Sequence, residues 1–311
     1  MKKRRRHSGG DLFGALAFCL FSVIFVVWLQ EQPYEIKLQE ASVEAVADVK
    51  PEETEYTQNT VMEVHFIDVG QSDCTLIKNG EYAMLIDAGD NDKGTAVQKY
   101  LQTRGVEKLD YLVLTHTDAD HIGGADVVLT KFDVDTVFMG DYEKDNATYR
   151  DVIDTLEYKQ LSWSTPQVGE IYTLGDASFT IIAPNTDYNT PNNTSIGLIL
   201  EKGEVRFAFT GDAEKEAERD IVQNGLDLSV DVYQVGHHGS SSSSSAALLD
   251  AFKPSYAVIS CGKDNPYGYP HREVIEAFRE RGIEVFRTDE QGNIVAVCDG
   301  ESITWDVDLV W

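Results

Sequence analysis

Residues 111–124 read YLVLTHTDADHIGG, and this stretch decides both the fold and the chemistry. Its apolar run, Leu112 to Leu114, is typical of a buried strand. Four polar side chains follow directly, namely His116, Asp118, Asp120 and His121. Such groups are costly to bury unless a charge compensates them, and imidazole and carboxylate are ligands of zinc, manganese and iron. We therefore expect a metal site dense enough for two ions, with a solvated polar turn as the alternative.

Polar residues also follow other predicted strands at the points where those strands end. Asp87 follows Leu85-Ile86, Asp212 follows the strand expected over 205–210, and a pair, His237 and His238, follows the one over 230–235. Taken alone, Asp212 would be a helix cap and Asp87 a turn former. Because loops at strand ends form the ligand crevice of layered α/β proteins, we expect these side chains to join the first cluster in one site.

The chain from residue 61 onward alternates between strands and helices. Strands are expected over 61–69, 74–78, 83–86, 109–114, 134–139, 170–173, 177–183, 195–201, 205–210, 230–235, 256–260, 282–287, 293–298 and 302–307. Helices are expected over 93–103, 125–130, 148–158, 213–224, 246–252 and 271–281. The six serines at 240–245 are expected to form a flexible loop. A start rich in strands that shifts to alternating strands and helices predicts a layered α/β architecture.

The N-terminus has the pattern of a membrane anchor. A basic cluster, Lys2 to Arg6, precedes 18 uncharged residues from Leu12 to Leu29, about the length that crosses a thin bilayer. We expect a cytoplasmic terminus over 1–10, a single-pass signal anchor over 11–29, a flexible linker over 30–60, and a domain over 61–311 outside the cytoplasm. Secretion after signal cleavage is the alternative, although Trp28-Leu29-Gln30-Glu31 is not a small-residue cleavage site.

The charge of the chain limits its partners. Residues 31–311 hold 21 Lys and Arg against 52 Asp and Glu, a net charge of −31. A body this acidic repels a polyanion at long range, so nucleic-acid binding would need a local basic patch or bound metals. Cys74, Cys261 and Cys298 lie in apolar contexts without regular spacing, which favours buried hydrophobes, with a single disulfide as the alternative.

Five motifs, in this order, resemble the metallo-β-lactamase superfamily, and in particular the hydrolase domain of ComEC-type competence proteins and their stand-alone relatives. They are FIDVGQSD (66–73), LIDAG (85–89), HTDADHIGG (116–124), TGD (210–212) and HHGS (237–240). The resemblance covers about residues 61–306. It implies an α/β (α+β) fold, a four-layer αββα sandwich with a two-metal site in the groove between its sheets.

The resemblance also implies roles for individual residues. It assigns His116 and Asp118 to one metal, Asp120 and His121 to the other, Asp212 to a bridge between them, and one of His237 and His238 to the remaining position. Asp87 would support the metal ligands without binding a metal itself. Further positions that match family motifs near the groove are Asp68, Asn193, Ser195, Tyr267 and His271.

Together these residues predict an extracytoplasmic hydrolase that uses two divalent ions, Zn²⁺ or Mn²⁺, to cleave a phosphodiester through a shared hydroxide. Carboxylate donors favour manganese and leave zinc possible. Asp120 would orient the water, and His238 or His271 would protonate the leaving oxygen. The substrate stays open between DNA, RNA and an envelope polymer such as one carrying choline-phosphate esters. A metal-binding module without catalysis is the alternative from another class.

Overall fold

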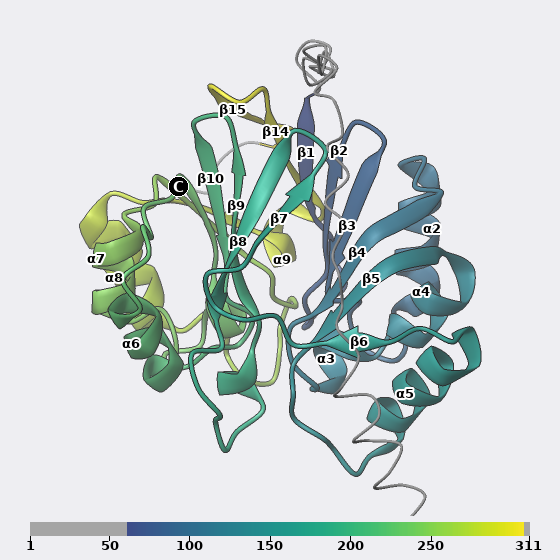
Figure 1. Ribbon diagram of the computed structural model, residues 1–311. Helices are drawn as coiled ribbons and strands as arrows, with labels where there is room; N and C mark the ends of the chain where they lie inside the picture. The colour runs from purple at the N-terminus through teal and green to yellow at the C-terminus, as the bar shows by residue number, and fades with distance from the viewer. Residues whose placement is uncertain (1–60, 308–311) are drawn as a thin grey trace, which may run out of the picture. The chain divides into compact units, whose positions relative to one another are not determined.

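The computed structural model describes residues 61–307, which contain two β-sheets (Figure 1). The first sheet is built from strands that come from both ends of the described chain. Its spatial order is β15 (Ile303–Trp305), β14 (Ile294–Cys298), β1 (Met62–Phe66), β2 (Thr75–Asn79), β3 (Tyr82–Ile86), β4 (Lys108–Leu114), β5 (Asp133–Met139) and β6 (Trp163–Ser164). Strands β3 to β6 run parallel to one another, and the strands from β15 to β3 are antiparallel.

The second sheet is built from the middle of the chain. Its spatial order is β13 (Glu284–Arg287), β12 (Tyr256–Ile259), β11 (Val232–Gln234), β10 (Val205–Phe209), β9 (Gly197–Lys202), β8 (Ala177–Ala183) and β7 (Ile171–Leu174). Strands β10 to β13 are parallel, and β7 to β10 are antiparallel. The predicted strands are thus present, with shifts of a few residues at their ends, and the two-residue β6 is an addition.

Helices cover the outer face of each sheet (Figure 1). The first sheet is covered by α2 (Gly94–Thr103), α4 (Ala125–Lys131) and α5 (Ala147–Lys159), and the second by α6 (Lys215–Gln223), α7 (Ala246–Phe252) and α8 (Arg272–Arg281). Short helical turns are α3 (Ala119–Ile122), η1 (Asn192–Thr194), η2 (Gly236–Gly239) and α9 (Thr288–Gln291). Helix α6 begins two residues later than predicted, because Ala213 belongs to the turn in which its N–H donates to the carbonyl of Thr210.

Three apolar clusters separate these layers. The central one lies between the two sheets, where the rings of Phe66 and Phe209 stack 6.5 Å apart. The other two fill the space between each sheet and its helices. Burying one such side chain contributes about 1.5–3 kcal/mol, so the alternation of apolar residues along the strands specifies which face each strand turns inward. Cys74, Cys261 and Cys298 are buried in these layers with free thiols, as their apolar contexts predict.

The predicted terminus, anchor and linker over residues 1–60 lie outside the described residues. Between residues 61 and 307, no helix has the length and hydropathy needed to cross a bilayer.

The topology places the polar strand ends together. Parallel neighbours end at the same edge of a sheet, and Asp87 follows β3 while His116 lies just beyond β4. Asp212 and His237 follow β10 and β11 in the same way on the second sheet. The two edges meet, as a hydrogen bond between the sheets shows. The hydroxyl of Thr75 donates to Oε1 of Gln234 at 2.8 Å.

Candidate metal centre

The turn η2 carries His237 and His238 on a strained backbone. Both have left-handed backbones, with φ of 53° and 54°, which costs of order 1 kcal/mol for each non-glycine residue. The turn is fastened from both sides, because the N–H of Gly236 donates to the Tyr233 hydroxyl at 2.9 Å and that of His237 to the Gly211 carbonyl at 3.2 Å. The result is that both imidazoles reach Asp212, at 3.6 Å from Nε2 of His237 and 3.9 Å from Nε2 of His238.

A first donor cluster consists of His116, His121 and Asp212, all buried. Nε2 of His121 lies 3.2 Å from Oδ1 of Asp212, and Nε2 of His116 lies 3.8 Å from Oδ2. Gly211 makes this approach possible, since it has a φ of +49° and a Cβ there would lie 2.9 Å from Oγ of Ser195. A side chain at this position would clash with Ser195 and Thr115, so the turn that carries Asp212 could not keep its place without a shift.

A second donor cluster consists of Asp120, His121 and His238, so the two clusters share His121. The short helix α3 places Asp120 and His121 next to each other. Nδ1 of His238 lies 3.0 Å from the carbonyl of Ser260, and its Nε2 lies 3.3 Å from Oδ2 of Asp120. Because a carbonyl only accepts, Nδ1 carries a proton and donates it, and Nε2 is the atom that faces the centre.

Asp87 supports the centre through hydrogen bonds to Thr115 and His121. This buried carboxylate accepts hydrogen bonds from the N–H of Thr115 at 2.8 Å, from the Thr115 hydroxyl at 2.7 Å and from Nδ1 of His121 at 2.7 Å. The bond to Nδ1 leaves Nε2 of His121 as the atom directed at Asp212. Carboxylates in this position orient ligating imidazoles and fix their tautomer.

Several atoms of the centre lack the partners that burial demands. Nε2 of His116, Nε2 of His121 and Oδ1 of Asp212 are buried without a hydrogen-bond partner. An unsatisfied buried polar group costs about 1–3 kcal/mol, and more when charged. A divalent cation is the species that accepts imidazole nitrogen and carboxylate oxygen together, so the donor set fits metal ions.

The pKa values of the centre show strong coupling between its imidazoles and carboxylates. Burial alone would lower the pKa of His121 and His238, but nearby carboxylates, Asp212 foremost, raise it well above its usual range, so a metal ion would displace a proton from each. Burial, followed by repulsion from His121, lowers the pKa of His116 to about 3, which keeps this imidazole in the neutral form that a metal requires. Burial alone would raise the pKa of Asp120, but the hydrogen bond from His238 and the charge of His121 lower it to about 2. The pKa of Asp212 is likewise held well below its usual range by His121 and His238, despite burial. Both carboxylates are therefore ionised at neutral pH.

Two predicted ligands lie at the edge of the centre. Asp118 is in neither donor cluster, since its Oδ1 forms an ion pair with Nζ of Lys144 and lies 4.0 Å from Nε2 of His116. His237 contacts Asp212 but also lies 3.1 Å from the Ser242 hydroxyl through Nδ1. His238 is the histidine of this pair that the structure places within a donor cluster.

The residues predicted around the groove are placed differently from one another. Ser195 contacts the centre, because its hydroxyl accepts the N–H of Asp212 at 3.1 Å and lies 3.4 Å from Nδ1 of His116. Asn193 lies one step further out and accepts the N–H of Glu214 at 2.9 Å. Asp68 is exposed and caps a turn by accepting the N–H of Gly70 at 3.1 Å. Within residues 61–307, Asp68 forms no hydrogen bond or ion pair with the donor clusters.

Tyr267 and His271 both contact the ring of Tyr269, which in turn contacts that of His237. The ring of Tyr269 lies 5.7 Å from that of His237, 5.0 Å from that of His271 and 5.3 Å from that of Tyr267. His271 accepts the N–H of Ser241 at 2.9 Å through Nδ1, so its proton is on Nε2. Tyr267 is 62% exposed at the end of this row of rings.

The sequence analysis missed two features of the centre. Asp73 is buried with Oδ1 at 3.4 Å from Nδ1 of His238, and it forms a third donor group with Asp87 and His121. The serine run, predicted to be a flexible loop, is instead packed against the centre. The hydroxyl of Ser243 donates to the Ala213 carbonyl at 2.8 Å, and the buried Glu218 accepts the N–H of Ser245 at 2.8 Å.

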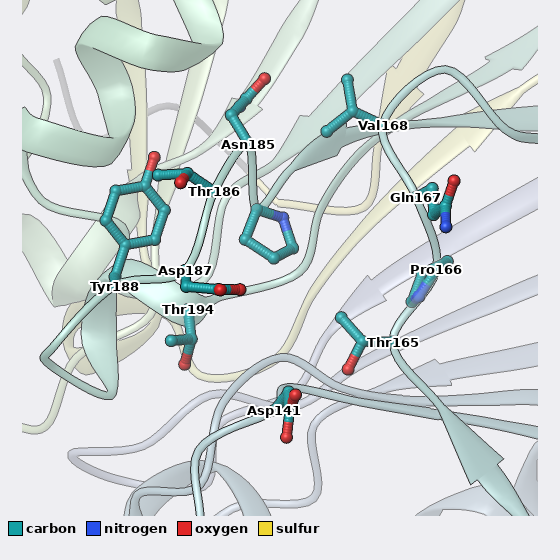
Figure 2. Close-up of a pocket in the computed structure, with 11 residues that line it drawn as sticks. Asp141, Thr165, Pro166, Gln167, Val168, Asn185, Thr186, Asp187, Tyr188 and Thr194 are labelled. Carbon is teal, nitrogen blue, oxygen red and sulfur yellow. The ribbon is translucent and has the colours of Figure 1, made fainter.

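A cavity of about 550 Å³ opens between the segment from Thr165 to Val168 and the segment from Asn185 to Tyr188 (Figure 2). It is lined by Asp141, Thr165, Pro166, Gln167, Val168, Pro184, Asn185, Thr186, Asp187, Tyr188 and Thr194. Thr194 of this lining precedes Ser195, whose hydroxyl lies 3.4 Å from Nδ1 of His116. The described lining holds two carboxylates and no lysine or arginine, which suits hydroxyl or amide groups of a ligand better than an anion.

Comparisons with known proteins agree with this arrangement. The family model described as Metallo-beta-lactamase superfamily matches residues 67–263. ComE operon protein 3 of Bacillus subtilis is 30% identical over 251 residues, which is 75% of this chain and 32% of the relative. Recombination protein 2 of Haemophilus influenzae is 31% identical over 239 residues, covering 75% of this chain and 28% of the relative. The chain thus spans about a third of the length of these relatives.

A solved structure supports the fold. The metallo-beta-lactamase fold protein YhfI from Bacillus subtilis superimposes with a TM-score of 0.52 at 14% identity, covering 76% of this chain and 99% of that one. At this identity the likeness concerns the arrangement of sheets and helices alone. The family match and the similarity to the competence relatives carry the assignment: this chain belongs to the metallo-beta-lactamase superfamily.

Proposed function

We propose that residues 61–307 form a metal-dependent phosphodiesterase with two divalent ions, Mn²⁺ or Zn²⁺. The observation that carries the proposal is the pair of donor clusters joined at His121, with buried nitrogen and oxygen atoms that lack hydrogen-bond partners. One ion would be held by Asp120, His121 and His238, with His237 at its edge, and the other by His116 and Asp118. Asp212, which reaches all four imidazoles, would lie between them.

Bound divalent ions would supply Lewis acidity, lower the pKa of a nearby water and offset charge on the phosphoryl oxygens. The protein supplies the rest. Asp120, ionised at neutral pH, accepts a hydrogen bond from the attacking water and takes its proton as the oxygen–phosphorus bond forms. His271, with its proton on Nε2, would donate a hydrogen bond from this atom to the ester oxygen, which takes a proton from solvent as its bond to phosphorus breaks. The products are a phosphomonoester and an alcohol.

The substrate class follows from charge. A net charge of −31 over residues 31–311 disfavours a long polyanion, and the acidic cavity disfavours a second anion. We infer a preference for an ester with an isolated phosphate and polar substituents, as in an envelope polymer, over long DNA or RNA. If residues 11–29 anchor the chain in the bilayer with the domain outside the cytoplasm, such a polymer lies within its reach.

The test is a hydrolysis assay with the metal-loaded protein and bis(p-nitrophenyl) phosphate. The parent should release p-nitrophenol, and Asp120→Ala and Asp212→Ala should abolish turnover while keeping the circular dichroism spectrum. Asp135→Ala, which removes a surface carboxylate paired with Lys108, is the control and should behave as the parent. Turnover in the Asp212→Ala variant equal to that of the parent would contradict the assignment. Bound metal without turnover on any ester would favour a non-catalytic metal-binding module.

A further inference from the structure

Lys144 reaches the mouth of the metal centre from outside it. Its Nζ forms an ion pair with Oδ1 of Asp118, the carboxylate that also lies 4.0 Å from Nε2 of His116. The side chains of Lys144 and Asp118 are 25% and 29% exposed, so the pair is half-buried at the entrance and open to solvent on one side. The ammonium of Lys144 is thus a partly exposed cation next to a carboxylate at the edge of the centre.

The loop that carries Lys144 is fastened in place. It joins β5 to α5, and the carbonyl of Tyr142 accepts the hydroxyl of Thr117 at 2.8 Å. The Tyr142 hydroxyl reaches the carbonyl of Asn189 at 3.4 Å. On the other side Asn146 caps α5 by accepting the N–H of Tyr149 at 2.8 Å. The backbone on both sides of Lys144 is thus anchored, while its four-carbon stem remains free to change partner.

The centre is rich in negative charge, which the ammonium of Lys144 can offset. Five carboxylates gather there, namely Asp73, Asp87, Asp118, Asp120 and Asp212. Two divalent ions would leave a net negative charge, which repels the single negative charge of a phosphodiester. Within residues 61–307, Lys144 is the only lysine or arginine that forms an ion pair with any of these carboxylates. It is therefore a cation in direct contact with these carboxylates, where it can offset this repulsion.

We propose that Lys144 is a phosphate-binding residue, which turns from Asp118 to donate a hydrogen bond to a non-bridging oxygen of the substrate. The movement also releases Oδ1 of Asp118 toward the centre. This inference rests on the proposed phosphodiesterase function, because it names the side chain that recognises the phosphate of that reaction. Lysine suits the task since its ammonium has three donors on a flexible stem and can exchange partners without moving the backbone.

The chain offers a matched control in Lys159. Its side chain is 26% exposed and pairs with Asp133 at 3.8 Å, at the C-terminal end of the same helix that Lys144 precedes. Lys144→Gln and Lys159→Gln therefore remove the same charge from similarly exposed lysines that each pair with an aspartate. Lys144→Arg keeps the charge and serves as the conservative variant.

The experiment measures kcat and KM for bis(p-nitrophenyl) phosphate, the Kd of inorganic phosphate for the manganese-loaded protein by calorimetry, and metal content by mass. Loss of one charge-assisted hydrogen bond corresponds to about tenfold in affinity. We expect Lys144→Gln to raise both KM and the phosphate Kd about tenfold with unchanged metal content. Lys144→Arg should stay within about threefold of the parent, and Lys159→Gln should match it.

Each outcome decides something. Parental KM and phosphate Kd in Lys144→Gln would overturn the role of Lys144 while leaving the phosphodiesterase intact. A lower metal content with parental phosphate affinity at saturating manganese would mean that Lys144 only positions Asp118, which also overturns the proposal. If the parent binds phosphate but cleaves no ester, the proposed function fails and the phosphate Kd still judges Lys144. If the parent does neither, both proposals fail.

Discussion

Replacing Asp87 by asparagine should weaken metal binding without unfolding the chain. The substitution keeps the volume, and one amide oxygen can still accept the N–H of Thr115. The amide nitrogen, however, would take the place of Oδ2, which accepts hydrogen bonds from both the Thr115 hydroxyl and Nδ1 of His121 at 2.7 Å. The imidazole loses the charged acceptor that sets its tautomer and direction. Loss of such a support costs 10- to 100-fold in metal affinity, or about 1.4–2.8 kcal/mol.

The assay is a competition titration of Zn²⁺ or Mn²⁺ against a chelator of known affinity. Asp110→Asn is the matched control, because Asp110 also accepts a backbone N–H, that of Ala83 at 2.8 Å, in the same sheet but away from the centre. We expect metal affinity to fall only in Asp87→Asn. The reasoning is refuted if Asp87→Asn binds metal within twofold of the parent, or if Asp110→Asn loses as much.

Three further predictions concern stability. Gly211→Ala should lower the free energy of unfolding by about 1–3 kcal/mol in denaturant titrations. The reason is that the new Cβ would lie 2.9 Å from Oγ of Ser195, at a φ of +49°. Gly225→Ala, with open space around its Cβ, is the control for backbone strain alone. Burial raises the pKa of Glu218, so the protonated carboxyl is favoured in the fold, and the parent should lose stability relative to Glu218→Gln as the pH rises through and above the usual range of this carboxyl. Removing metal with a chelator should lower the melting temperature, since metal at 100 times its Kd stabilises the fold by about 2.7 kcal/mol, and an unchanged melting curve would show that no metal was bound.

Much of the fold was predictable because its signals are local. The apolar run at Leu112 to Leu114 forms β4 as expected, and helix α7 (Ala246–Phe252) has the predicted bounds. Asp87, which follows β3, and Asp212, which follows β10, also lie together, since both contact His121, as the strand-end argument predicts. In these cases the periodicity of apolar residues alone selects the element and the face that it buries.

The features that the sequence did not reveal depend on contacts between distant residues. Asp73 follows a break between strands and gives no sign that His238, far along the chain, will pack against it. The motif that contains Asp118 cannot show that Lys144 pairs with this carboxylate. The serine run was read as flexible from its composition. Its short hydroxyl side chains instead satisfy backbone groups that the fold buries, as Ser243 does for the Ala213 carbonyl.

The most direct measurement is the anomalous diffraction from crystals of the chain grown with Mn²⁺ or Zn²⁺, recorded on both sides of the absorption edge of the metal. We predict two peaks, one bonded to His116 and the other to His121, each in contact with Asp212. Peaks outside these donors, or none at full metal occupancy in solution, would contradict the account.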